Sequence, residues 1–362
     1  MSQNAEHWWP TDAELEAALR NAEALFGGVE MQYLLTIWVF LASTVALAWV
    51  AWRLHYAHRQ GRGALAFLRF LFPKSIYLHR STWVDVQLIA INQIFSPISL
   101  SITALATGVV ASAVSHGLFW VFPGHNPDFE WAFWPLLGFT LAIALVSDLA
   151  TYVVHRLYHT VPALWEIHKV HHSAEVMSPL TIFRKHPLFD LAARLLKAAF
   201  MGPLQGAIFF AWAGPVDALT AFGANLIFAF FHMFGAGLRH SHVWLSYGPV
   251  IERVIISPAQ HQVHHSTARR HWDKNFGQMF AIWDWMFGSL YVPKGYEELE
   301  FGIKGDPSSD FSGLWGGLVR PVVRAWQVAT GRRLGAQPTA AWQRRQQAAK
   351  AVETPAPGTQ PG

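Results

Sequence analysis

Three short segments of the sequence hold histidines at spacings that suit metal binding. HRLYH places two histidines at i and i+4, HKVHH places three at i, i+3 and i+4, and HQVHH repeats that triplet. Residues three and four apart share one face of a helix, so each segment can direct two or three imidazoles to one point. Imidazole is the commonest metal ligand among side chains. The positions are His155, His159, His168, His171, His172, His261, His264 and His265.

A purely structural explanation of these histidines is weak. Of the 19 histidines, 13 fall between His155 and His271. Imidazoles packed on one face repel one another when protonated and lose hydration when neutral. A lone histidine such as His116 is more typical of an ordinary core or interfacial position. The repeated triplet beside an i, i+4 pair therefore favours a metal site.

The number of candidate ligands indicates two metal ions. A closed structural zinc site needs only four ligands, whereas the three segments supply eight. The chain contains no cysteine, so any metal must be held by His, Asp or Glu. In soluble di-iron bundles, helices contribute Glu and His to a metal pair in the core, and histidines would take that part here. Imidazole alone does not choose among Zn, Cu, Fe and Ni.

Carboxylates near the histidines are expected to orient the rings. Neutral ligands leave the charge of the ions uncompensated, and metal-bound histidines commonly donate their other ring N–H to such a partner. Asp148 stands seven residues before His155, two helical turns back on the same face. It is the best candidate, and Glu175 and Asp284 follow.

The composition predicts a membrane protein. The chain is 52% hydrophobic and 14% charged and contains 18 Trp, which is too apolar for an ordinary soluble domain. Residues 33–52 contain no charge and match the length of about 20 residues that a membrane helix needs. Residues 84–122 are too long for one straight crossing and contain Pro97, so either a kinked helix or a helix with a re-entrant piece is expected. The further candidates are residues 131–154, 192–212 and 216–234, the last two as a hairpin broken at AGP.

The expected fold class is all-α. It is a polytopic membrane helical bundle with about four to six membrane helices and a cytoplasmic histidine-rich helical cap. Lys and Arg concentrate in residues 53–80, whereas the segment before the first span and residues 124–130 are acidic. The positive-inside rule puts residues 53–80 in the cytoplasm. The predicted spans then bring every histidine group to this cytoplasmic face.

The ends of the chain carry weaker signals. Residues 11–26 are predicted to form an amphipathic helix that begins with a capping box from Thr11 and Glu14, and no cleaved secretory signal is expected. Residues 311–333 mix Trp, Leu and Val with Arg, as in segments that lie at a membrane surface. The tail from Gln337 is rich in Ala, Gln, Pro and Gly and is predicted to be disordered. The net charge of +4 indicates contact with anionic lipid, and no nucleic acid is expected.

The motifs resemble, in order and spacing, those of the fatty acid hydroxylase/sterol desaturase superfamily of integral-membrane di-iron enzymes. The resemblance covers roughly residues 147–290. DLATYVVHRLYH is similar to the first histidine box of the family, LWEIHKVHHSAE to the second, and ISPAQHQVHHS to the third. FRKHPLFD and NFGQMFAIWDWMFGSL resemble the segments that follow the second and third boxes. LRHSHVWL resembles an intermediate element, although Leu238 and His242 replace its usual Phe and Asn.

The resemblance implies a non-haem di-iron centre that uses O2 to hydroxylate or desaturate a lipid C–H bond. It adds His240 as a ninth ligand and leaves His242 and His232 unassigned, while His186 is expected to fix the loop beside Pro187. The expected division of the chain, in which only the catalytic domain rests on the resemblance, is an N-terminal amphipathic segment, N-terminal membrane helices, a hydroxylase-like catalytic domain, a C-terminal interfacial segment and a disordered tail. Their bounds are 1–30, 31–130, 131–295, 296–335 and 336–362.

Each turnover with O2 needs two external electrons, so an electron-donor protein is expected to dock on the cytoplasmic face, through residues 53–80. No fused haem-binding donor domain is visible. This compact form favours a multi-pass protein of a bacterial inner membrane.

Three other functions fit parts of the pattern. A membrane haem protein with two axial histidines would use one histidine per helix near the middle of the membrane. A zinc peptidase would need the Glu of H-E-x-x-H, but Lys169 and Gln262 stand at that place. A metal transporter would hold its ligands inside the spans. The motifs do not distinguish hydroxylation, desaturation and ether cleavage.

Overall fold

The structure is a computed structural model that describes residues 38–61, 63–125, 133–213 and 235–332. These residues form helices joined by loops, with two isolated β-bridges and no strand, so the predicted all-α class is confirmed. The first helix is Trp38–His55. The next are α2 (Ala57–Gln60), α3 (Ala64–Leu71), α4 (Lys74–Tyr77), α5 (Arg80–Val121), α6 (Phe133–Thr160), α7 (Pro162–His172), η1 (Pro179–Phe183), α8 (Pro187–Ile208), η2 (Phe209–Ala213), η3 (Ala236–Leu238), α10 (Gly248–Ile251), α11 (Pro258–His264), η4 (Arg269–His271), α12 (Ile282–Met286), η5 (Ser308–Phe311), η6 (Trp315–Val319) and α13 (Arg320–Thr330).

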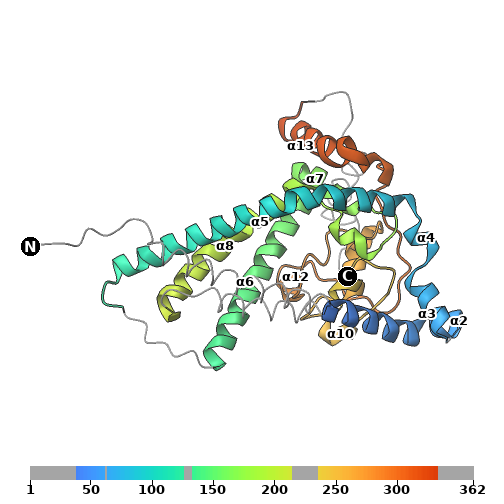
Figure 1. The fold of residues 1–362 in the computed structure, drawn as a ribbon, viewed down its shortest axis with the longest axis horizontal. Coiled ribbons are helices and arrows are strands. Elements are labelled where there is room, and N and C mark those ends of the chain that lie inside the picture. Colours follow the sequence, from blue (N-terminus) through green and yellow to red (C-terminus); the bar gives the residue numbers. More distant parts are fainter. Residues whose placement is uncertain (1–37, 62, 126–132, 214–234, 333–362) are drawn as a thin grey trace, which may run out of the picture.

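Helices α5, α6 and α8 pack together as a bundle, with α8 in contact with both of the other helices (Figure 1). α5 and α8 lie against each other, and two glycines of α8 allow the close approach. A Cβ at Gly202 would lie 2.6 Å from Val110 Cγ1, and one at Gly206 would lie 2.5 Å from the carbonyl oxygen of Ala111. Small residues allow helix backbones to approach in this way.

Helix α5 is continuous for 42 residues and is about 63 Å long at 1.5 Å per residue. The alternative of a helix followed by a re-entrant piece over residues 84–122 is therefore wrong. A length of about 63 Å is twice the roughly 30 Å of a bilayer core. One half of α5 packs against α8, and the other half passes over η1 and η5 beside the histidine-bearing elements (Figure 1).

Within the described ranges, one helix, Trp38–His55, is long and apolar enough to cross a membrane, and Leu105–Val121 is a shorter apolar stretch. Helix α8 covers most of the predicted span 192–212, but it carries Arg194 and Lys197. The predicted segments 11–26 and 216–234 and the tail from Gln337 lie outside the described residues. The total of about four to six membrane helices stays a prediction.

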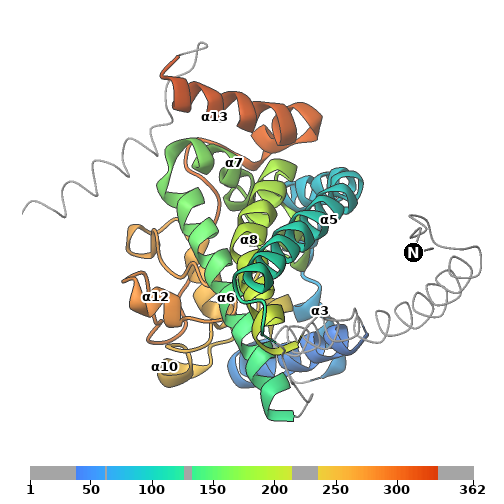
Figure 2. The same ribbon diagram turned by 90° about the vertical axis from the view of Figure 1, so that its left-hand side faces the viewer.

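Helix α13 covers α7 on the side away from α10 and α12 (Figure 2). Leu314, Trp315, Val322 and Trp326 are exposed along η6 and α13. Exposed apolar side chains beside arginines suit a helix at a membrane surface, as the sequence predicts for residues 311–333.

Candidate metal centre

The structure brings the nine predicted ligand histidines into two groups, which we call the five-histidine group and the four-histidine group. In each group, one ring nitrogen from every member lies within 4.8 Å of those of all the other members. Eight of the nine residues are buried. The five-histidine group is His155, His159, His168, His172 and His264, and the four-histidine group is His171, His240, His261 and His265.

Helix geometry explains how each triplet divides between the groups. Successive residues of a helix are turned by about 100°, so His168 and His172 lie within about 40° of each other on α7 and share a group, whereas His171, about 100° from His172, joins the other group. On α11, the i, i+4 pair joins the four-histidine group and His264 joins the other. Because α7 and α11 each contribute to both groups, the groups are adjacent. The ring centroids of His172 and His265, which belong to different groups, are 4.4 Å apart.

The starts of these two short helices are fixed by the sequence. The hydroxyl of Ser257 accepts a hydrogen bond from the backbone N–H of Gln260 at 3.1 Å, and the Gln260 side chain accepts from the Ser257 N–H at 3.0 Å. This capping box, followed by Pro258 in the first turn, begins α11 just before HQVHH. Pro162 has the same place in α7. The helical spacing of both triplets is therefore set locally.

Nitrogen positions in the four-histidine group fit a metal ion. The Nε2 atom of His240 lies 3.1 Å from that of His171 and 2.9 Å from that of His261, and the His261 and His265 Nε2 atoms are 3.3 Å apart. Imidazole nitrogens about 2.0 to 2.1 Å from one ion would be separated by about 3 to 3.4 Å. Within the described part of the chain, the Nδ1 atoms of His240, His261 and His265 are buried without a hydrogen-bond partner. The fit to a metal ion therefore rests on the spacing of the Nε2 atoms, because these Nδ1 atoms stay without a partner whether or not Nε2 binds an ion.

Backbone carbonyls hold three of the rings. The Nδ1 atom of His155 lies 2.9 Å from the Phe276 oxygen, and that of His264 lies 2.8 Å from the Lys274 oxygen. The Nδ1 atom of His171 lies 3.2 Å from the oxygen of Arg184. An N–H at Nδ1 that donates to a carbonyl leaves the Nε2 lone pair free for a metal.

The electrostatics of the site keep its rings neutral. Burial, followed by the charge of neighbouring groups, holds the pKa of six histidines of α7, the η3 region and α11 well below 6.5. Neutral rings bind a cation without first releasing a proton. The six are His168, His171, His172, His240, His261 and His265.

The carboxylates act on the rings less directly than the sequence suggested. Asp148 accepts hydrogen bonds from the backbone N–H groups of Met279 and Phe280 at 2.8 and 2.9 Å and from Trp283 Nε1 at 3.1 Å. Asp284 accepts from the N–H of Phe276, whose carbonyl faces His155. Both carboxylates therefore hold the loop that positions His155, and among the described residues neither accepts a hydrogen bond from an imidazole.

Glu175, the third predicted carboxylate, lies away from the rings. It accepts a hydrogen bond from the Ser308 N–H at 2.8 Å and pairs with Arg80.

Sequence reasoning missed the segment Asp273–Lys274–Asn275. Asp273 and Asn275 both have φ of 56°, a left-handed conformation that Asp and Asn adopt more readily than most residues. This backbone presents the Lys274 carbonyl to His264, and Asp273 Oδ1 lies 3.6 Å from His159 Nδ1. Asn275 is fixed by hydrogen bonds to the backbones of Gln260 and Tyr291. The one available signal was a pair of turn-forming residues shortly after the third triplet.

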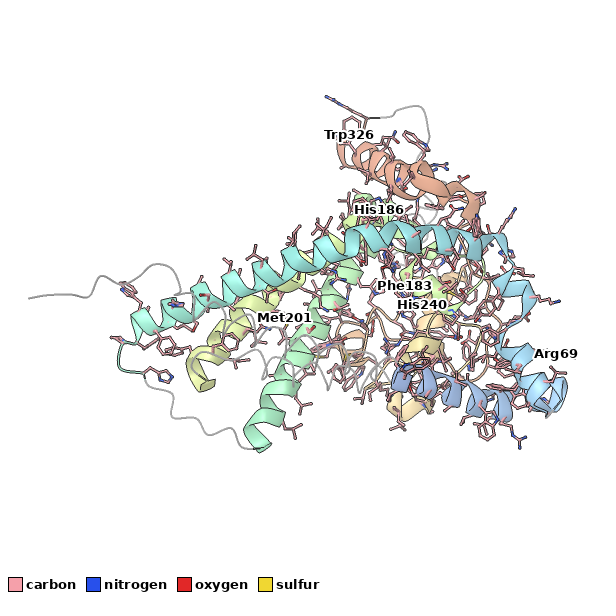
Figure 3. All side chains as sticks on the ribbon, in the orientation of Figure 1. Arg69, Phe183, His186, Met201, His240 and Trp326 are labelled. Atoms are coloured by element: carbon pink, nitrogen blue, oxygen red, sulfur yellow. The ribbon has the colours of Figure 1, made fainter. Side chains whose placement is uncertain are left out.

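His186 and His242, for which the sequence predicts no ligand role, lie outside both groups. His186 caps α8, accepting from the Leu188 N–H at 3.1 Å, and its Nε2 lies 2.8 Å from the Leu318 oxygen. Figure 3 shows His186 apart from His240. His242 Nε2 lies 2.8 Å from the Phe70 oxygen, and His232 lies outside the described residues.

Replacing Asp148 with asparagine is expected to weaken metal retention or turnover by about 10- to 100-fold. The amide NH2 of asparagine would face one of the three N–H donors and loosen the loop that positions His155. Bound metal and turnover of the purified variant test this. Asp310→Asn, at a site that pairs with Arg320 on the surface, is the control. Unchanged metal content and rate in Asp148→Asn would show that the loop does not depend on this carboxylate.

Comparisons with known proteins identify similar chains. Residues 140–289 match the family model for fatty acid hydroxylase. The chain is 28% identical over 225 residues to ornithine lipid hydroxylase OlsE of Rhizobium tropici, which covers 60% of this chain and 59% of that protein. It is 30% identical over 156 residues to human alkylglycerol monooxygenase, covering 43% and 31%. It is also 30% identical over 169 residues to fatty acid hydroxylase vlmA of Lecanicillium sp, covering 43% of each chain.

The chain thus spans between about a third and three fifths of the length of these relatives. The matched segment 140–289 contains all nine histidines of the two groups. No solved structure gives a significant match.

Proposed function

This chain belongs to the fatty acid hydroxylase/sterol desaturase superfamily. From this premise we propose that the protein is a membrane-bound, O2-dependent oxidoreductase that hydroxylates a C–H bond of a lipid. The observation that carries the proposal is the convergence of nine histidines in two adjacent groups. The relatives named above are two hydroxylases and a monooxygenase. Hydroxylation is therefore favoured over desaturation.

The nine imidazoles would hold two non-haem iron ions, one in each group, with Asp148 supporting the site through its loop. When bound, this iron pair supplies the redox chemistry that side chains lack for breaking an unactivated C–H bond. The protein positions the rings through the carbonyls of Phe276, Arg184 and Lys274. Its buried packing excludes bulk water from the site.

The reaction needs an external source of electrons. One lipid C–H bond, one O2, two electrons and two protons give one C–OH bond and one water. An electron-donor protein must therefore dock, and the cationic side chains of Arg53, Arg69, Lys74 and Arg80 are exposed on the segment that the sequence places in the cytoplasm. Such a surface favours an acidic partner. We place the protein in a bacterial inner membrane, as a multi-pass protein with this face towards the cytoplasm.

The ring geometry disfavours the alternative of a membrane haem protein. A haem with two axial histidines separates its ligands by the macrocycle, because the two imidazoles lie on opposite faces of the iron. The His240 and His261 Nε2 atoms are only 2.9 Å apart, and the other rings of the group surround them. This arrangement suits a single ion held by several rings.

The lipids of cells that express the protein test the proposal. We expect lipids that have gained one oxygen atom relative to cells without it, with the atom derived from isotopically heavy O2. We also expect the purified protein to hold non-haem iron at about two ions per chain. Lipids that lose two hydrogens would indicate desaturation, and stoichiometric haem would indicate the alternative function.

A further inference from the structure

Helix α10 and the turn that follows it expose an apolar face. Val250 is 78% exposed, and Ile251 and Val254 are also exposed. The N–H groups of Val254 and Ile255 both donate to the Ile251 carbonyl at 2.9 Å, so the turn continues the winding of α10. Residues three and four apart on a helix lie on one face. The three exposed side chains therefore form one small apolar surface.

The end of α12 exposes further large apolar side chains close to this face. Trp285 is 67% exposed, and Met286 and Phe287 are exposed beside it. The Ala281 N–H donates to the Val254 carbonyl at 2.8 Å, and the Trp285 N–H donates to the Ala281 carbonyl at 2.9 Å. Two hydrogen bonds thus link the backbones of Val254 and Trp285, and two views show α10 and α12 side by side (Figure 1, Figure 2). We call the six exposed side chains the α10–α12 surface: Val250, Ile251, Val254, Trp285, Met286 and Phe287.

The charges around the α10–α12 surface fit a lipid bilayer. Residues 248–256 and 279–289, which the structure describes in full, contain two carboxylates, and both Glu252 and Asp284 are fully buried. The one charged side chain that these stretches expose is Arg253, in the turn after α10. Apolar side chains beside a cation suit the boundary between the headgroups and the acyl chains of a membrane. The cytoplasmic leaflet also carries anionic lipid, which attracts cationic side chains.

The α10–α12 surface lies beside the predicted membrane span. Tyr247, directly before α10, packs against a buried cluster that joins the helix Trp38–His55 to the segment before α10. Within the described ranges this helix is the one that is long and apolar enough to cross a membrane, and the basic residues 53–80 that follow it are predicted to lie in the cytoplasm. Because the contacts come from the second half of the helix, α10 lies near its cytoplasmic end. The cluster contains Ala48, Ala51, Trp52, Leu238, Val243 and Leu245.

We propose that the α10–α12 surface is immersed in the interfacial layer of the cytoplasmic leaflet. An exposed apolar patch marks a contact with a protein or with a membrane, and the neighbouring span and the exposed cation favour lipid. Together with α13, on the other side of α7, this surface would surround the membrane helices with interfacial side chains. The inference rests on the proposed function only in treating the protein as membrane-bound.

This contact would bring lipid close to the candidate metal centre. Asp284 of α12 accepts hydrogen bonds from the N–H groups of Phe276 and Gly277, each at 2.8 Å. The Phe276 carbonyl in turn lies 2.9 Å from His155 Nδ1. The helix that carries the exposed Trp285 therefore also holds the loop that positions a ring of the five-histidine group. An enzyme that oxidises lipid needs the bilayer near its metal ions.

Nitroxide labels on single cysteines test the inference, because the chain contains no cysteine of its own. The variants are Val250→Cys, Val254→Cys and Met286→Cys, in the full-length protein in vesicles of phosphatidylcholine and phosphatidylglycerol. Electron paramagnetic resonance measures the access of each label to O2, which concentrates in lipid, and to a water-soluble nickel chelate. We expect all three labels to lie about 5 to 10 Å inside the boundary between headgroups and acyl chains.

Two labelled control positions calibrate the depth. Leu41→Cys, at an exposed position of the helix Trp38–His55, should report the bilayer, and Glu298→Cys, at an exposed acidic position, should report water. Ile251→Cys and Phe287→Cys replace any variant of α10 or α12 that fails to fold, because both positions are exposed on the same surface.

Two results would overturn the inference. Labels on the α10–α12 surface that meet the nickel chelate as readily as the Glu298→Cys label lie in water. Labels that are immobilised and shielded from both reagents are covered by protein, such as a second copy of this chain. The proposed function fails separately: if the labels lie in the bilayer but the protein oxidises no lipid, the surface stands without the hydroxylase. If lipid is oxidised while the labels lie in water, the hydroxylase stands without this contact.

Discussion

His171→Ala is expected to abolish lipid oxidation and to lower bound iron from about two ions per chain to about one. His171 is one of four rings around a single point, and its Nε2 lies 3.1 Å from that of His240. Removal of residues that merely support metal ligands costs about 10- to 100-fold, so loss of a ligand itself should cost more than about 100-fold in turnover. Iron content and the rate of lipid oxidation of the purified variant provide the measurement.

His264→Ala tests the five-histidine group in the same way. It should lower iron independently of His171→Ala, and the double variant should hold almost none. The matched control is His116→Ala, because His116 is exposed and lies outside both groups. A single variant that kept full turnover would remove that residue from the ligand set. Loss of both ions in each single variant would show that the two groups load together.

Most members of the two histidine groups could be predicted from the sequence because the information is local. The histidines spaced at i, i+3 and i+4 lie on or at the end of the helices α7 and α11. Both helices have a proline in the first turn. The division of each triplet between two groups was not predicted, because residues at i, i+3 and i+4 all lie within about 100° of one another around a helix. His240 lies in no triplet, and its place came from the resemblance to a family.

The partners of the rings could not be predicted from the sequence. Three rings face backbone carbonyls, and since every residue has a carbonyl, the sequence does not mark those of Phe276, Arg184 and Lys274. Asp148 illustrates the same limit. Asp148 lies seven residues before His155, so both residues are on the same face of α6. The Asp148 carboxylate, however, contacts the loop around Met279, which is 131 residues later in the chain. Only tertiary packing determines that the carboxylate holds this loop.

The length of α5 was also beyond sequence reasoning. Pro97 disfavours a straight helix, and residues 84–122 exceed one membrane crossing. In the structure α5 passes position 97 without a break. The long helix extends beyond its contact with α8 because its first turns are built into a polar cluster. Ser81 and Asp85 on these turns contact Arg184, which lies just before α8.

Arg184→Met is expected to give the largest loss of stability, about 3 to 5 kcal/mol. The guanidinium is fully buried and donates to Asp85 Oδ1 at 2.8 Å, to Ser173 Oγ at 2.7 Å and to Ser308 Oγ at 2.8 Å. It thus joins α5, the end of α7 and η5. Without it, Asp85 becomes a buried carboxylate without its cation. Unfolding in mixed micelles, compared with that of the unmodified protein, measures the loss.

The same substitution should also disturb the metal site, because the carbonyl of Arg184 faces His171 Nδ1. Arg184→Lys keeps the charge but not the planar fork that reaches several acceptors at once, so it should recover only part of the stability. Arg69→Met, at an exposed arginine of α3, should change stability by less than about 0.5 kcal/mol.

A double variant decides whether the unpaired Asp85 causes the loss. Arg184→Met with Asp85→Leu removes both charges, and replacing a whole buried ion pair by apolar residues is often neutral. The double variant should therefore be more stable than Arg184→Met alone. If the two losses simply add, the energy of the cluster lies in the hydrogen bonds to Ser173 and Ser308 and not in the ion pair.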